Sequence, residues 1–226
     1  QRRAVASAML FGSWTTFSIP ALSPGAPVAR HEDRGTGRRL PIIHGITEHD
    51  AGPYRMERLD LEFGNGERRR FERLHGRGRG AVAVVPMLDD DTVLLVREYA
   101  AGVHRYELGL VKGRIDAGET PEQAADRELK EEAGYGARSL VALRELTLAP
   151  TYMSHVAHLV IARDLYPQRL PGDEPEPLEV LPWRLDALHE LILREDFSEG
   201  RSIAALFIAR EWLRTRGQQP GQPNDP

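Results

Sequence analysis

Three glutamates in the middle of the chain, Glu128, Glu131 and Glu132, have a spacing that could bind a hard cation. At about 100° per residue, positions i, i+3 and i+4 fall on one face of an α-helix. Like charges at this spacing destabilise a helix, so an ion or a basic side chain must offset them. Mg²⁺ prefers oxygen ligands, usually one or two carboxylates with water and substrate phosphates. Spacing alone leaves open a Mg²⁺ site or a solvated acidic face paired with Arg127 and Lys130.

A helix from Thr120 to Gly134 would position these carboxylates. Thr120 supplies an N-cap hydroxyl, Pro121 suits the first helical position, and Gln123 completes a capping box. Gly134 can adopt the left-handed conformation that ends many helices. Both ends of the helix are therefore predicted from local sequence.

The run over residues 113–135 resembles the Nudix box, glycine-x5-glutamate-x7-Arg-Glu-aliphatic-x-Glu-Glu-x-Gly-aliphatic. The fixed positions that match are Gly113, Glu119, Arg127, Glu128, Glu131, Glu132 and Gly134, with Leu129 in the first aliphatic position. Tyr135 departs from the last aliphatic position, which nevertheless stays hydrophobic. The resemblance implies a Nudix fold and metal-dependent hydrolysis of a pyrophosphate.

The resemblance also implies roles for the box residues. Glu128 and Glu132 would be the principal ligands of Mg²⁺, with Mn²⁺ as a second candidate cation, and Lys112 would add its backbone carbonyl. Glu131 would bind a further metal or polarise the attacking water. Arg127 would hold the glutamates by hydrogen bonds, and Glu119 would steady loop and helix by pairing with Arg127. Gly113, Glu119 and Gly134 would be the structural residues of the motif.

Segments outside the box resemble the ADP compounds hydrolase branch of the family. They are residues 54–63, 93–99, 106–116, 164–177 and 202–213. This branch implies hydrolysis of ADP-ribose, diadenosine polyphosphates or NADH to AMP and a phosphorylated second moiety. The alternatives are a Nudix hydrolase of another class, acting on an NTP, GDP-mannose or an RNA cap, and a Nudix-fold regulator that binds a ligand.

Related hydrolases use an acidic general base on a late loop, and residues 170–177 occupy that position here. Prolines restrict this loop, which could present Glu174, our preferred base, or Asp173. Glu107, in the strand before the box, and Arg97 and Tyr99 are the predicted substrate-binding residues. Residues 97–100 take the place of an Arg-Gln-aromatic-Arg pattern whose second arginine is alanine here, which weakens the transfer of ADP-sugar contacts.

Composition limits the partners and the chemistry. The chain has 226 residues, 41% hydrophobic and 28% charged, and a net charge of -4, so no global basic field favours nucleic acid or an anionic membrane. A chain without cysteine has no disulfides, no thiolate catalysis and no cysteine-ligated zinc, which favours a cytoplasmic location. The expected binding partner is a small nucleoside diphosphate compound, and the family resemblance also implies that the chain forms a homodimer.

Alternating and continuous apolar runs predict the remaining elements. We expect strands at residues 54–63, 67–74, 81–88, 92–96, 142–148, 156–162 and 178–183, and amphipathic helices at 185–194 and 198–214. Gly64-Asn65-Gly66 predicts a hairpin between the first two strands. The fold class is α+β, an α/β/α sandwich with a mixed sheet and an N-terminal β-hairpin element. The predicted divisions are a disordered extension or linker (1–45), the N-terminal β-element (46–80), a Nudix hydrolase domain (81–216) and a flexible tail (217–226).

Overall fold

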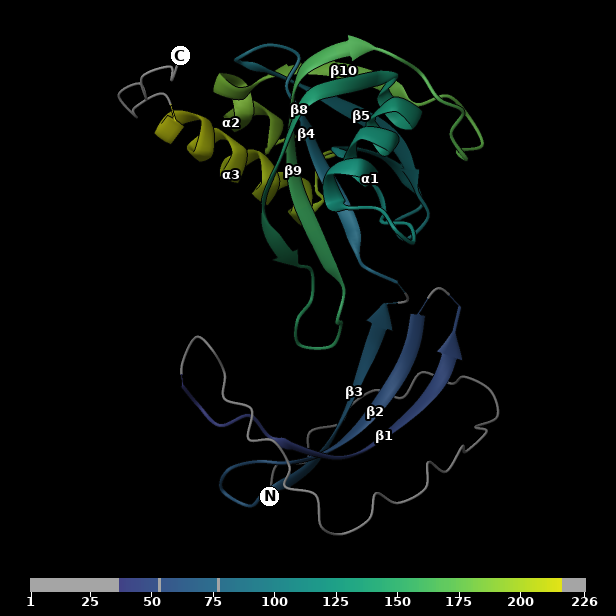
Figure 1. Ribbon diagram of the computed structural model, residues 1–226, viewed down its shortest axis with the longest axis vertical. Coiled ribbons are helices and arrows are strands. Elements are labelled where there is room, and N and C mark those ends of the chain that lie inside the picture. The colour runs from purple at the N-terminus through teal and green to yellow at the C-terminus, as the bar shows by residue number, and fades with distance from the viewer. Residues whose placement is uncertain (1–36, 53, 77, 217–226) are drawn as a thin grey trace. The chain divides into compact units, whose positions relative to one another are not determined.

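The computed structural model describes residues 37–52, 54–76 and 78–216, and their contacts form two units (Figure 1). The first unit contains three strands together with Thr151–Ser154. The second contains the other described residues, including the box. The expectations for residues 1–36 and 217–226 lie outside the described residues.

The first unit is an antiparallel sheet in the order β1-β2-β3. Its strands are β1 (Ile42–Ala51), β2 (Tyr54–Glu62) and β3 (Arg68–Gly76). The predicted hairpin joins β2 to β3, and the Gly66 N–H donates to the Phe63 carbonyl across 2.9 Å. β1 was not predicted, and it begins inside the segment assigned to a linker. Because β1 pairs with β2 along its length, backbone hydrogen bonds define this strand where the apolar pattern is weak.

The second unit is built on two sheets, in the orders β7-β4-β9-β8 and β10-β5-β6. Their strands are β4 (Ala81–Pro86), β5 (Thr92–Ala100), β6 (Arg105–Gly109), β7 (Val111–Arg114), β8 (Tyr135–Thr147), β9 (Val156–Pro167) and β10 (Glu179–Arg184). β4 and β9 are parallel, and the other neighbours are antiparallel. The mixed sheet predicted from the sequence is confirmed.

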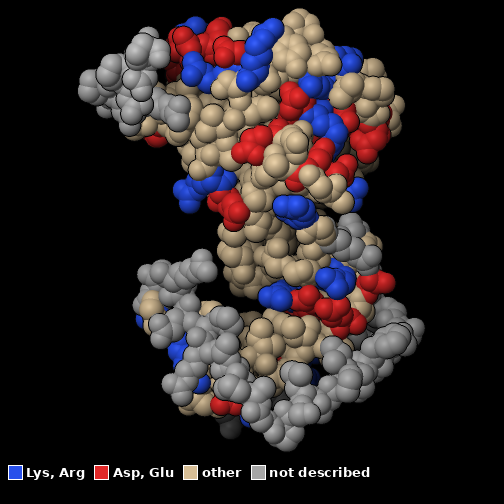
Figure 2. Space-filling view, in the orientation of Figure 1, with Lys and Arg blue, Asp and Glu red and all other residues tan. Residues whose placement is uncertain are grey.

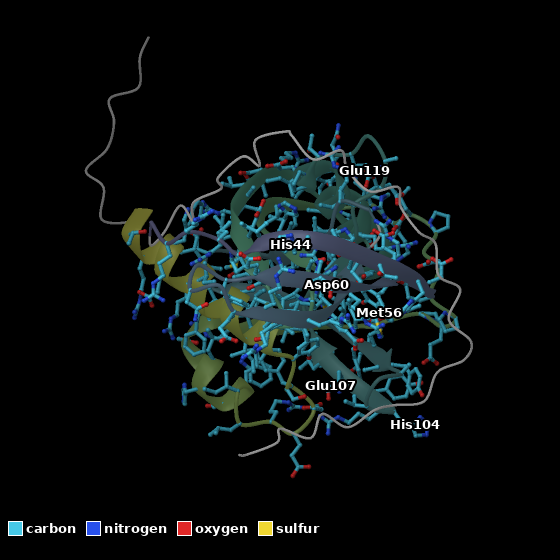
Figure 3. The ribbon with its side chains drawn as sticks, turned by 90° about the horizontal axis from the view of Figure 1, so that it is seen from below. His44, Met56, Asp60, His104, Glu107 and Glu119 are labelled. Carbon is cyan, nitrogen blue, oxygen red and sulfur yellow. The ribbon has the colours of Figure 1, made fainter. Side chains whose placement is uncertain are left out.

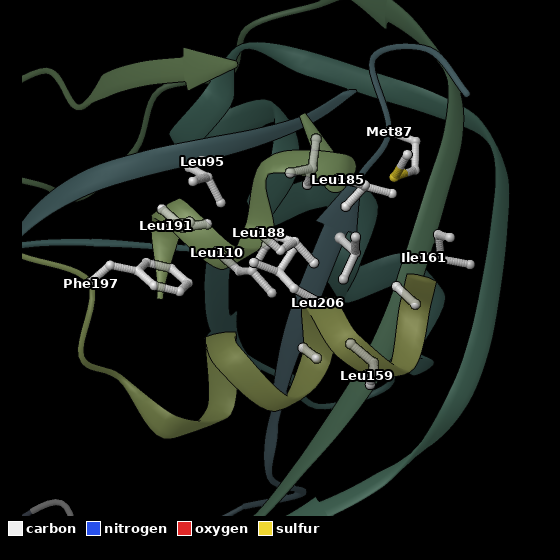
Figure 4. Close-up of a cluster of buried hydrophobic side chains, with 14 of the residues drawn as sticks. Met87, Leu95, Leu110, Leu159, Ile161, Leu185, Leu188, Leu191, Phe197 and Leu206 are labelled. Carbon is white, nitrogen blue, oxygen red and sulfur yellow. The ribbon is translucent and has the colours of Figure 1, made fainter. Parts of the chain in front are cut away.

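Alternating side chains of β4 and β9 separate two cores. Val82 and Val84 face a cluster that includes Leu129 of the box helix. Val85 and Leu159 face the larger cluster, which helix α3 (Gly200–Arg216) covers and Figure 4 shows. Helices therefore pack on both faces of the mixed sheet, as an α/β/α sandwich requires.

The helix expected at residues 185–194 is much shorter in the structure. It consists of a 3₁₀ turn, η2 (Leu185–Ala187), and one helical turn, α2 (Leu188–Leu191). The chain then turns toward the sheet, where the Leu108 N–H donates to the Asp196 carbonyl and the Arg97 guanidinium donates to the Asp196 carboxylate across 2.7 Å. These tertiary contacts end the helix although the apolar pattern continues.

Charges on the visible face are mixed in sign, with acidic and basic side chains interspersed (Figure 2). Within the described residues no helix has the length and apolar character needed to span a bilayer.

Candidate active site

The box helix begins as its sequence predicts. α1 (Pro121–Glu128) has Thr120 as N-cap, and the Thr120 hydroxyl accepts the Gln123 N–H across 3.2 Å. The Gln123 side chain in turn accepts the Thr120 N–H across 2.9 Å, which completes the capping box. The start of the helix is thus fixed by two reciprocal hydrogen bonds.

The end of the helix differs from the prediction in its geometry. Its last turn, η1 (Leu129–Ala133), is a π-helix, and Gly134 then closes it with a positive φ of 77°. The loop that follows β9 bonds to this wider turn, because Leu170 N–H donates to the Lys130 carbonyl across 3.1 Å. Single π-helical turns are uncommon and occur often at functional sites.

Arg127 lies at the centre of the acidic cluster. Its guanidinium binds both carboxylate oxygens of Glu119, at 2.8 and 3.0 Å. It also donates to Glu128 across 2.7 Å, to Glu131 across 3.0 Å and to the Arg114 carbonyl across 2.9 Å. One rigid fork therefore ties three glutamates of the motif to the strand that precedes the helix.

Glu128 and Glu132 are buried carboxylates, with exposed fractions of 8% and 4%. Burial raises the pKa of Glu128 to about 7 and that of Glu132 to about 9. The Lys112 N–H donates to Glu132 Oε1 across 3.4 Å, whereas Glu132 Oε2 accepts no hydrogen bond from any described residue. Such a buried acceptor is costly unless another group completes it.

Gly113 is the point at which β7 contacts the carboxyl group of Glu128. A Cβ at this position would overlap the carboxyl group of Glu128, so the helix and the strand can approach only across glycine. The first glycine of the motif is thus explained by close packing, because no unusual φ is found there.

Two acidic residues outside the box change the pKa values of these carboxylates. Besides burial and the charge of Glu128, the charges of Glu98 and Glu174 raise the pKa of Glu132, and Lys112 opposes them. Sequence reasoning missed Glu98. Its position on a strand could have identified it, because Glu98 lies opposite Glu107 in the β5–β6 pair and its side chain is on the same face of the sheet.

The acidic loop places its two candidate bases differently. Glu174 is half-buried and Asp173 is exposed. A Cβ on Gly172 would overlap the Glu174 carboxylate and lie 3.7 Å from the carbonyl oxygen of Glu131. Glu174 thus folds back over Gly172 toward the box, and its charge also raises the pKa of Glu128.

The three predicted substrate residues lie on β5 and β6 and have partners within the fold. Arg97 donates to Glu179 across 2.8 Å, in addition to its bond to Asp196. Glu107 accepts the N–H of Ser198 across 3.2 Å. The Tyr99 hydroxyl lies 2.6 Å from His104 Nδ1, and the tyrosine is 44% exposed. In Figure 3 Glu107 and His104 lie apart from Glu119, the carboxylate that anchors Arg127.

The donor set fits a hard cation. Among the described residues no three His, Cys, Asp or Glu side chains form a group arranged to hold a metal ion. The unpartnered, buried Glu132 Oε2 is nevertheless the kind of hard oxygen donor that Mg²⁺ binds. The charge of Glu128 raises the pKa of Glu132, and the backbone N–H of Lys112 donates to the Glu132 carboxylate.

Two family models match the chain. The model of the NUDIX domain matches residues 77–207, and that of the NudE-type Nudix hydrolase N-terminal domain matches residues 41–73. The NUDIX match falls on the second structural unit except for Thr151–Ser154, and the N-terminal match falls within the first unit.

Individual relatives are similar over most of their length. The chain is 49% identical over 165 residues to the ADP compounds hydrolase NudE of Escherichia coli strain K12. The aligned residues cover 73% of this chain and 88% of that protein. It is 29% identical over 152 residues to the ADP-ribose pyrophosphatase of Bacillus subtilis strain 168, covering 66% and 81%. A crystal structure of an ADP compounds hydrolase matches with a TM-score of 0.74 and 45% identity, covering 81% of this chain and 100% of that one.

Proposed function

We propose that this chain, which belongs to the Nudix hydrolase family, hydrolyses the pyrophosphate of ADP-linked compounds such as ADP-ribose, diadenosine di- or triphosphate and NADH. The observation that carries the reaction type is the buried pair Glu128 and Glu132, of which Glu128 packs against Gly113 and accepts a hydrogen bond from Arg127. The substrate class is supported by the names of the relatives, an ADP compounds hydrolase and an ADP-ribose pyrophosphatase.

We propose that Glu128 and Glu132 hold Mg²⁺ or Mn²⁺, together with the backbone carbonyl of Lys112. The cation would neutralise charge on the pyrophosphate oxygens and acidify a bound water. Glu131 would bind a further cation or polarise that water. Arg127 keeps the Glu128 and Glu131 carboxylates in place from its bidentate anchor on Glu119.

Glu174 is the proposed general base, and it would take the proton of the attacking water. Its half-buried carboxylate lies over Gly172, which is itself near the Glu131 carbonyl, and its charge raises the pKa values of Glu128 and Glu132. A base must reach the water that it deprotonates, so a loop residue directed toward the box is favoured over exposed Asp173.

Arg97, Tyr99 and Glu107 are the proposed substrate residues. Tyr99 is exposed and offers a ring to a base or a sugar, while Arg97 and Glu107 would keep β5, β6 and residues 194–200 in register around it. A different substrate class, GDP-mannose, has some support, because a GDP-mannose pyrophosphatase of Citrobacter koseri is 30% identical over 157 residues.

A kcat/KM panel with Mg²⁺ and identified products tests the proposal. The substrates are ADP-ribose, diadenosine di- and triphosphate, NADH and GDP-mannose. We expect AMP from ADP-linked compounds. Glu128→Gln should lower turnover about 100-fold, and Glu122→Gln on the same helix is the matched control. Release of GMP from GDP-mannose, with no AMP from any ADP-linked compound, would reject the substrate class.

We also propose a cytoplasmic homodimer in which the β1–β3 unit contributes contacts to the partner. The division into an N-terminal β-element (46–80) and a hydrolase domain (81–216) is part of the same proposal. The absence of cysteine suits a reducing compartment. Light scattering with the full chain measures the mass, and a fully active monomer would refute the dimer.

A further inference from the structure

The loop over residues 170–177 is attached to the box at its first residue. Leu170 N–H donates to the Lys130 carbonyl in the π-helical turn, and the Arg169 guanidinium donates to the Glu131 carbonyl across 3.3 Å. The main chain leaves this anchor through Pro171. The beginning of the loop is therefore fixed relative to the glutamates.

The same loop has a second anchor at its other end, on β6. The Tyr106 hydroxyl donates a hydrogen bond to the Glu176 carboxylate. Glu176 lies between Pro175 and Pro177, whose rings restrict the backbone on both sides. One side-chain contact can thus hold a segment that has few conformations of its own.

The Tyr106 ring is itself held in place on β6. It lies opposite Tyr99 in the β5–β6 pair, and the two rings meet edge to face with centroids 5.8 Å apart. Such aromatic pairs add stability beyond the area that they bury. The hydroxyl of Tyr106 is therefore presented from a fixed ring on a regular strand.

We propose that Tyr106 is a positioning residue which, through Glu176, sets the location of Glu174 over the box glutamates. Glu174 lies between the two anchors, two residues before Glu176. Loss of the second anchor would leave the loop held at Leu170 and, beyond Pro177, at the start of β10, with no side-chain anchor at Glu176. Displacement of a reacting group by about 1 Å can cost about 100-fold in rate. The proposal rests on the proposed role of Glu174 as general base.

Tyr106→Phe tests the anchor, because it removes the hydroxyl and keeps the ring. We expect kcat for ADP-ribose to fall roughly tenfold, with KM nearly unchanged. Tyr152→Phe is the matched control, since Tyr152 is 55% exposed and Tyr106 is 50% exposed. A raised KM with unchanged kcat would overturn the proposal, because it would mean that Tyr106 contacts the substrate.

Partner variants separate the contact from a general effect on folding. Glu176→Ala should reproduce the loss, whereas Glu176→Gln keeps an oxygen acceptor for the Tyr106 hydroxyl and should retain most of the activity. The double variant Tyr106→Phe/Glu176→Ala should be no slower than either single variant, because both remove one interaction. Additive losses would overturn the anchor.

Hydrogen exchange of the 170–177 segment distinguishes failure of the anchor from failure of the proposed base. We expect faster exchange there in Tyr106→Phe and Glu176→Ala, and unchanged exchange in Tyr152→Phe. Unchanged exchange in Tyr106→Phe would refute the anchor. If exchange rises as expected while Glu174→Gln retains full kcat, the anchor stands and the base assignment falls.

Discussion

Gly113 and Glu128 meet where β7 crosses the box helix, and a Cβ on the glycine would occupy the space of the glutamate's carboxyl group. The carboxylate therefore has its place only because the strand has no side chain there. Protein interiors are close-packed, so such a position tolerates no added atom without a shift. The glutamate that must shift is one of the two proposed metal ligands.

Gly113→Ala is expected to lower kcat/KM by about 100-fold, because the methyl group displaces the Glu128 carboxylate. Gly102→Ala is the control, since a Cβ there has no atom within 4 Å and the residue has no positive φ. Steady-state kinetics and circular dichroism of both variants provide the measurement. Full activity of Gly113→Ala would show that Glu128 can move without consequence.

Local signals in the sequence predicted much of this architecture. The capping box of Thr120 and Gln123 and the hairpin at residues 64–66 need only neighbouring residues to form, and both are present in the structure. The apolar runs of β4 and β9 predicted buried strands, because strands in the centre of a mixed sheet are covered on both faces.

Contacts between distant residues determine what the sequence did not predict. The last turn of the box helix is π-helical, and its carbonyls meet residues 169 and 170, which lie far along the chain. Glu98 reaches the electrostatic environment of Glu132 from another strand, and Tyr106 meets Glu176 seventy residues later. No pattern of neighbouring residues encodes such pairs.

Arg127→Lys should lower kcat about 10- to 100-fold, although it keeps the positive charge. A lysine cannot bind both oxygens of Glu119 and also reach Glu128 and Glu131, as the guanidinium fork does. Arg163→Lys is the control, because Arg163 makes one surface ion pair, with Asp90. Equal rates for the two variants would contradict a positioning role of Arg127.

Without divalent cations, the free energy of unfolding should fall as the pH rises from about 5 to about 9. Burial raises the pKa of Glu128 to about 7 and that of Glu132 to about 9, from an ordinary value of 4.5. In this window the folded chain keeps protons that the unfolded chain releases. Their contribution to stability is complete below pH 4.5 and is lost as the pH passes the folded values.

Thermal unfolding in a chelator, measured across this pH range, provides the comparison. Glu132→Gln should show a flatter dependence of Tm on pH, because the amide does not titrate. Mg²⁺ added at pH 8 should raise the Tm of the natural chain and leave that of Glu132→Gln nearly unchanged. A Tm of the natural chain that rises between pH 5 and pH 9 in the chelator would refute the prediction.

Glu174→Gln should lower kcat about 100-fold, while Asp173→Asn should change it less than about twofold. The two carboxylates are adjacent in a proline-bounded loop, yet Glu174 is half-buried and folds over Gly172 toward the box, whereas Asp173 is exposed. The pair therefore tests orientation at constant net charge, because each substitution removes one negative charge from the same loop. Saturating ADP-ribose and Mg²⁺ make kcat the relevant quantity, since a lost base slows the chemical step without weakening binding. If Asp173→Asn were the slower variant, the base would be Asp173, and the loop would have to change conformation on substrate binding so that Asp173 faces the box.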